Sequence, residues 1–327
     1  MNFFARMLKR RQWARLPEEK KRQLLAEAVE LLKLDPEAYE LLKMAQADGV
    51  EIKFSSELTG SKTSAQHVLN SGTQKQYIEI CPHMGSGELK TPGKIATDLA
   101  HELRHYWQYK QLGVTPQNRK HINRSPRLAF IFNRVIEADA YAFRDRFVDT
   151  VNENFRSFAE MAEKLLKLQQ SGRKPSADEI EMASLEITRK FRQFCAENKN
   201  YLKNEFMEYL KSKSLSDSYD PEGARYLHLF HTSWVAEKTD FDAVKHIPEL
   251  TLADIRKVLK SGVTQNAPGY LDEMSDDQFE ELVLSHAHQG ALEAVSLMEK
   301  FRAAAASNDN QTAKILRRQV KKKIRKL

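Results

Sequence analysis

Apolar side chains recur at helical spacing in the first part of the chain. Between residues 17 and 48 they fall three and four positions apart, which is typical of helices with one buried face. Asp35 followed by Pro36 predicts the start of a second helix, because aspartate caps a helix N-terminus and proline suits the first turn. The first such stripe consists of Leu24, Leu25, Ala28, Leu31 and Leu32.

The period changes to two after Gly49. Val50, Ile52 and Phe54 alternate with polar residues, as in a half-buried strand. Residues 64–70 and 76–81 are two further strand candidates, and no other part of the sequence is strand-rich. We therefore expect an α+β fold that is predominantly α-helical, with one small sheet.

Two helices are predicted after this sheet. Thr91 and Pro92 indicate a helix that runs to about Leu112, and Ser125 with Pro126 indicates a helix through residue 148. Later helices are expected over residues 151–170, 176–212, 222–237, 251–261, 275–303 and 311–326. We divide the chain into an N-terminal helical segment (1–48), a core (49–150), a helical domain (151–305) and a basic tail (306–327).

Composition excludes several classes of protein. With 41% hydrophobic and 30% charged residues, the chain is neither wholly disordered nor fibrous. Two cysteines among 327 residues do not make a disulfide framework. The sequence has no apolar run of membrane-spanning length and no secretory signal pattern. We therefore expect a cytoplasmic protein without a transmembrane segment.

The formal net charge of +7 is concentrated at the two ends. Residues 1–16 carry five basic side chains and residues 314–327 carry eight, with no acidic residue in either segment. Removing those thirteen charges leaves −6 for the rest of the chain. The basic ends could bind nucleic acid or an anionic membrane, so a binding protein with a structural metal, or with none, is the alternative to an enzyme.

One motif carries recognisable chemistry. His101, Glu102 and His105 form an H-E-x-x-H sequence inside the predicted helix 91–112. Residues four apart lie one turn apart on one helix face, so both imidazoles can reach the same ion. Zinc accepts neutral nitrogen ligands in a tetrahedral site, and the adjacent Glu102 can act as general base without coordinating the metal.

A catalytic zinc site needs a third protein ligand. The helix that begins after Ser125 offers Glu137 and Asp139, which are two residues apart and therefore point about 200° apart. Only one of them can face the metal. Asp139 lies on an apolar stripe, where a carboxylate needs a partner, so it is either the ligand or an acceptor for a ligand histidine.

The small sheet, the H-E-x-x-H helix and a later helix with Glu137, Asp139 and three alanines together resemble the gluzincin branch of zinc metallopeptidases. The phrase around Glu137 is also similar to that of phage-repressor-cleaving and radiation-response peptidases and of compact bacterial families. The resemblance covers residues 49–150. In common gluzincins the ligand glutamate precedes the aspartate by four residues, whereas here the interval is two.

The resemblance implies a zincin-like core that binds Zn²⁺ and hydrolyses peptide bonds. Its zinc would be held by His101, His105 and an acid, for which we favour Glu137 over Asp139, with Glu102 activating water. The substrate would be a protein or peptide. Several side chains are candidates to stabilise the developing oxyanion: Tyr106, His121, Tyr141, Arg144, Tyr226, His228 and His231.

Overall fold

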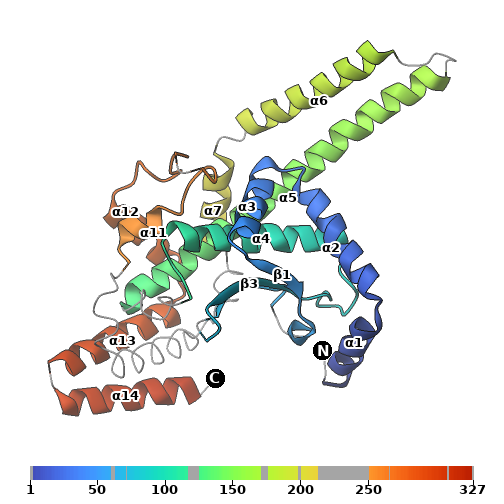
Figure 1. The fold of residues 1–327 in the computed structure, drawn as a ribbon. Helices are drawn as coiled ribbons and strands as arrows, with labels where there is room; N and C mark the ends of the chain where they lie inside the picture. Colours follow the sequence, from blue (N-terminus) through green and yellow to red (C-terminus); the bar gives the residue numbers. More distant parts are fainter. Residues whose placement is uncertain are drawn as a thin grey trace. The chain divides into compact units, whose positions relative to one another are not determined.

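The computed structural model is an α+β fold in which helices predominate and a small sheet holds all the strands of the described residues (Figure 1). It describes residues 3–59, 63–70, 72–116, 125–170, 176–197, 200–212, 250–264, 266–307 and 309–325. This confirms the predicted fold class at the level of secondary structure. The helix predicted over 222–237 lies outside the described residues.

The helices follow the predicted order closely. Asp35 caps α3 by accepting hydrogen bonds from the backbone of Glu37 and Ala38, both at 2.9 Å, as the Asp-Pro pair predicts. The helices are α1 (Phe3–Arg15), α2 (Glu18–Leu32), α3 (Pro36–Ala47), α4 (Pro92–Gln111), α5 (Pro126–Gln170), α6 (Ala177–Glu197), α7 (Tyr201–Lys211), α11 (Leu252–Arg256), α12 (Asp276–Ser285), α13 (Gln289–Ala306) and α14 (Asn310–Arg325), with a short 3₁₀ helix, η1 (Ser56–Leu58).

The sheet has three strands in the order β1-β3-β2. They are β1 (Glu51–Phe54), β2 (Ala65–Asn70) and β3 (Lys75–Ile80), and β1 pairs in parallel with β3. Burial alternates along β2, as expected for a strand with one face packed on other elements. β2 is therefore an edge strand of the sheet.

Backbone contacts divide the chain into two compact units. One contains residues 1–68, 77–104 and 142–202, and the other contains residues 69–76, 105–141 and 203–327. Two of the divisions fall inside long helices, one in α4 between Arg104 and His105 and one in α5 between Tyr141 and Ala142. Each of these helices therefore runs through both units without interruption.

Several helix boundaries differ from those predicted. α5 is one helix of 45 residues, because no glycine or proline interrupts it between residues 127 and 170. Its second half lies beside α6 (Figure 1), where Lys164 pairs with Glu186 at 3.2 Å and Lys190 pairs with Glu160. The helix predicted over 275–303 is divided into α12 and α13, and α11 is only five residues long.

The basic C-terminal segment is helical and packs against the helix before it. α13 and α14 lie side by side (Figure 1), and Ala313 and Leu316 contact a core cluster that includes Phe130 and Met298. Lys314, Arg317 and Arg318 are exposed on α14, which has no acidic residue. Binding of an anionic partner by the basic ends stays a prediction.

α4 begins in a buried polar cluster. Thr91 caps it by accepting a hydrogen bond from the backbone of Lys94 at 3.3 Å. Asp98, on the first turns, accepts from Lys90 Nζ, Lys94 Nζ and Ser64 Oγ at 2.7–2.8 Å. The side chain of Lys90 is only 1% exposed, and its ammonium also donates to the carbonyl of Ser64 at 2.7 Å. The cluster thus fixes the helix that carries the H-E-x-x-H motif against the start of β2.

Substituting Asp98 should destabilise the fold strongly. Asp98→Asn leaves the Lys90 ammonium buried without its counter-charge, and we expect the free energy of unfolding to fall by about 3–5 kcal/mol. Lys94→Gln is the matched control, because Lys94 is 37% exposed and its loss should cost less than about 1 kcal/mol. Urea unfolding followed by circular dichroism measures both. Equal effects of the two substitutions would contradict a buried Lys90–Asp98 pair.

The contribution of Asp98 should also depend on pH. Burial acts to raise the pKa of Asp98, but the ammonium groups of Lys90 and Lys94 outweigh it and hold this pKa below its ordinary value. A depressed carboxyl pKa stabilises the fold above the unfolded-state value near pH 3.9 and loses that stabilisation as the pH falls through the folded-state pKa. The stability difference between the wild type and Asp98→Asn should therefore be constant above about pH 5 and shrink below pH 4.

Candidate metal centre

The H-E-x-x-H face of α4 is enclosed by protein. His101, Glu102 and His105 are each at most 9% exposed. Leu99, two residues before the motif, and Leu103, within it, are fully buried. Histidines on an exposed, solvated helix would not have these surroundings.

α5 supplies the acidic residue that faces this motif. Ala138 and Ala140 are fully buried, and such small side chains allow the backbones of two helices to approach closely. The side chain of Gln108 on α4 donates from Nε2 to the carbonyl of Ile136 on α5 at 2.9 Å. Glu137 therefore lies next to the last turns of α4.

Among the described residues, His101, His105 and Glu137 form a group with metal-ligand geometry. One ligand atom from each lies within 4.8 Å of the others. His105 and Glu137 belong to the same compact unit, and their Nε2 and Oε1 atoms are 3.5 Å apart. His101 lies one turn earlier on the same continuous helix.

The separation between His105 and Glu137 fits a shared metal ion. A direct N–H···O hydrogen bond is about 2.7–3.2 Å long, shorter than the 3.5 Å observed. Two ligands of a tetrahedral zinc ion, each about 2.1 Å from it, are about 3.4 Å apart. Two imidazoles and a carboxylate are also the donor set of many catalytic zinc sites. The residues present therefore fit zinc.

Asp139 is not part of this group. It is fully buried and accepts hydrogen bonds from Gln108 Nε2 and from the hydroxyl of Tyr270, both at 2.7 Å. The two acids thus point to different surroundings, as their spacing on a helix requires. Gln108 connects Asp139 to a ligand histidine, because its Oε1 is 2.8 Å from His105 Nδ1.

Glu102 contacts the sheet. Its Oε2 accepts a hydrogen bond from the backbone amide of His67 on β2 at 2.7 Å. The bond fixes the carboxylate beside His101 without using a side chain of the candidate ligand set. This arrangement suits a group that transfers protons rather than one that coordinates a metal.

Arg104 is a charged residue between the two histidines of the motif. It is fully buried, and its guanidinium carbon lies 5.1 Å from the centre of the Phe143 ring on α5. Its charge also lowers the pKa of the carboxyl of Glu37, which burial raises above the ordinary value. A charged residue is tolerated inside the H-E-x-x-H motif because it faces an aromatic ring and a carboxylate rather than water.

Three of the oxyanion candidates lie in the described part of the chain, and each has a partner there. Tyr106 is buried and its hydroxyl accepts from Lys110 at 3.3 Å, Tyr141 stacks on Tyr209, and Arg144 pairs with its neighbour Asp145. The remaining candidates, His121, Tyr226, His228 and His231, lie outside the described residues.

Sequence reasoning missed two residues of the site. Gln108 stands three positions after His105, on the same helix face, and this spacing is a signal that could have identified it. Tyr270 lies 131 residues from Asp139 in a segment without periodicity, so nothing in the sequence indicates their contact.

Comparison of the chain with protein-family models, with curated proteins and with solved structures gives no match. In the described part of the chain, no helix is both long and apolar enough to cross a membrane. The case for the site therefore rests on its own geometry.

Zinc affinity should depend on Glu137. Glu137→Gln replaces a charged ligand with a neutral amide of the same size, and we expect the Kd for zinc to rise by at least about 100-fold. Competition with a chromophoric chelator measures this change. Glu153→Gln, elsewhere on α5, is the control and should leave the Kd unchanged. Wild-type affinity in Glu137→Gln would rule out Glu137 as the third ligand and return Asp139 to that place.

Proposed function

We propose that this protein is a zinc-dependent metallopeptidase with a zincin-like site, in which His101, His105 and Glu137 hold the metal and Glu102 is the general base. The observation that carries the proposal is the 3.5 Å separation of His105 Nε2 and Glu137 Oε1, within a group of three metal-type ligands. The buried H-E-x-x-H face on α4 supports it, because a carboxylate stands beside the ligands.

The chemistry requires a group that accepts and returns a proton. When bound, zinc supplies Lewis-acid activation of water and of the scissile carbonyl. The Glu102 carboxylate takes the proton from the attacking water and delivers it to the leaving amine. The amide of His67 keeps this carboxylate in one orientation throughout, so that little reorganisation is needed when the proton moves.

The ligand carboxylate and the general base come from different helices. Glu137 comes from α5 and Glu102 from α4, next to its contact with β2. One carboxylate can therefore remain bound to the metal while the other is free to change its protonation state. A protein or peptide substrate is the reactant class that suits a metal, a general base and the edge strand β2 in one site.

Removing the general base should abolish hydrolysis and leave metal binding intact. Glu102→Gln retains an oxygen that can accept from the amide of His67, but it cannot take up a proton. We expect cleavage of an unfolded protein substrate to fall by about 10²–10⁴-fold, with unchanged zinc content. Cleavage is followed by mass spectrometry of the products, and zinc by atomic absorption.

Two outcomes contradict the proposal in different ways. Absence of stoichiometric zinc from the purified protein, with all its histidines intact, rejects the metal site. Cleavage by Glu102→Gln at the wild-type rate, with zinc bound, rejects the mechanism but not the site. Glu153→Gln serves as the control and should cleave like the wild type.

A further inference from the structure

A chain of polar groups leads from the candidate metal ligand His105 into the later part of the sequence. Tyr270 donates to Asp139 Oδ1, Gln108 donates to Asp139 Oδ2, and Gln108 Oε1 lies 2.8 Å from His105 Nδ1. All four residues belong to one compact unit and all are buried. Their hydrogens are therefore fixed by one another rather than by water.

The orientation of the Gln108 amide follows from its partners. Nε2 lies 2.9 Å from the carbonyl oxygen of Ile136 and 2.7 Å from a carboxylate oxygen of Asp139, and both of these atoms can only accept hydrogen bonds. If the amide nitrogen and oxygen exchanged places, the oxygen would lie against two other acceptor oxygens with no hydrogen between them, which is repulsive. The NH₂ group must therefore point to α5, and the oxygen must point to His105.

This orientation determines which nitrogen of His105 carries the proton. Gln108 Oε1 accepts a hydrogen bond, so Nδ1 of His105 has to donate one. A neutral imidazole carries one proton, and the lone pair is then on Nε2. Nε2 is the atom that faces Glu137 at 3.5 Å.

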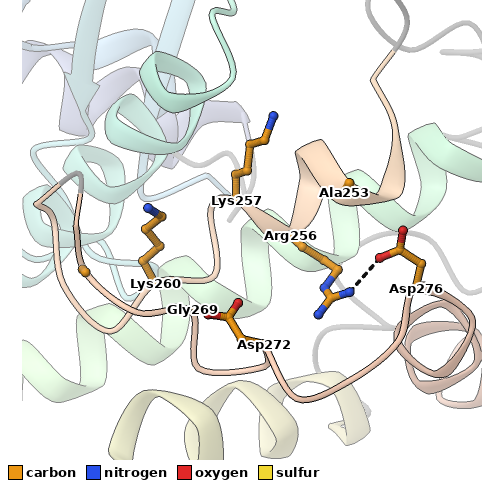
Figure 2. A pocket seen from close by; sticks show the side chains of 8 residues that line it. Ala253, Arg256, Lys257, Lys260, Gly269, Asp272 and Asp276 are labelled. Carbon is orange, nitrogen blue, oxygen red and sulfur yellow. Dashed lines mark hydrogen bonds and ion pairs between the residues drawn. The ribbon is translucent and has the colours of Figure 1, made fainter.

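The segment that contains Tyr270 is itself firmly built. Arg256 donates to the carbonyl of Leu271 at 2.9 Å and to that of Met274 at 2.6 Å. Its guanidinium also pairs with Asp276 at 2.6 Å (Figure 2). The backbone amide of Tyr270 donates to the carbonyl of Leu259 at 3.0 Å. The hydroxyl is thus presented from a loop that is held at several points.

The residue before Tyr270 also has to be small. Asp272 accepts from the backbone amide of Gly269 at 2.9 Å, and a Cβ atom at position 269 would lie 2.1 Å from its Oδ1 (Figure 2). The same part of the chain makes a second hydrogen bond to a helix of the site, because the indole of Trp107 on α4 donates to the carbonyl of Val263 at 3.2 Å. Val263 therefore contacts α4, and Tyr270 contacts α5.

We infer that Tyr270, Asp139 and Gln108 are positioning residues that set the tautomer of His105 and hold its Nε2 ready for a metal ion. This inference rests on the proposed function, which supplies the metal. It assigns a role to residues 259–276, far along the chain from the H-E-x-x-H motif. Such partners of metal ligands change affinity by about 10–100-fold when they are removed.

The test measures the tautomer in metal-free protein. Long-range ¹H–¹⁵N correlation spectra of the full chain, labelled with ¹⁵N-histidine, identify the protonated nitrogen at pH 8.5, where imidazole is neutral. The signals of His105 are assigned by their loss in His105→Gln. We expect the Nδ1–H form in the wild type. Gln108→Met removes the acceptor of the Nδ1–H group, so it should increase the Nε2–H form and weaken zinc binding by about 10–100-fold.

A second pair of variants separates positioning from general stability. Tyr270→Phe removes only a hydroxyl and should retain the Nδ1–H form while weakening zinc binding about 10-fold. Tyr201→Phe is the matched control, because it removes a tyrosine–aspartate hydrogen bond of the same length at the surface. It should leave zinc affinity unchanged. If Gln108→Met does not fold, Gln108→Leu answers the same question, because it also lacks the acceptor of His105.

The outcomes distinguish the inference from the proposed function. If the wild type binds zinc, and both the tautomer and the affinity are unchanged in Gln108→Met, the inference is wrong and the metal site stands. Nε2–H in the wild type also overturns the inference. If the wild type has the Nδ1–H form but binds no zinc, the proposed function fails, and the role toward a metal fails with it.

Discussion

The side chain of Gln108 is the contact on which the candidate site depends. It joins α4 to α5 by bonding the backbone of Ile136 and the carboxylate of Asp139, and it meets the ring of His105 with its remaining oxygen. Two of its partners, the carbonyl of Ile136 and the carboxylate of Asp139, can only accept, so the buried amide has one orientation, because an unsatisfied polar group in this interior would cost about 1–3 kcal/mol.

The two carboxylates on α5 are only two residues apart, but they have different partners. Glu137 points to the histidines of α4, whereas Asp139 points to Gln108 and Tyr270. A third carboxylate, on Glu102, is bonded to the backbone of β2. The proposed enzyme thus has a carboxylate for the metal, one for positioning a ligand and one for proton transfer, each defined by its hydrogen-bond partners rather than by its residue type.

Local signals in the sequence predict much of this arrangement, and non-local contacts account for what they miss. The helix that carries His101 and His105, with its Thr91 cap, is predicted by periodicity and capping. Periodicity also identifies the buried stripe that contains Asp139. It does not place Arg104 against Phe143 or Tyr270 against Asp139, because such contacts depend on how distant segments pack. The exact boundaries of α5, α12 and α13 were likewise missed, since the strength of a helix break depends on its tertiary surroundings.

The most direct measurement is X-ray absorption at the zinc K-edge of the purified, zinc-loaded protein. The account predicts one zinc ion per chain, a first shell of nitrogen and oxygen at about 2.0–2.2 Å, and outer-shell scattering from two imidazoles, with no sulfur near 2.3 Å. Loss of one imidazole contribution in His105→Gln would assign the second ligand. A sulfur-containing shell, or a spectrum of hydrated zinc without imidazole, would contradict a metal centre built from His101, His105 and Glu137.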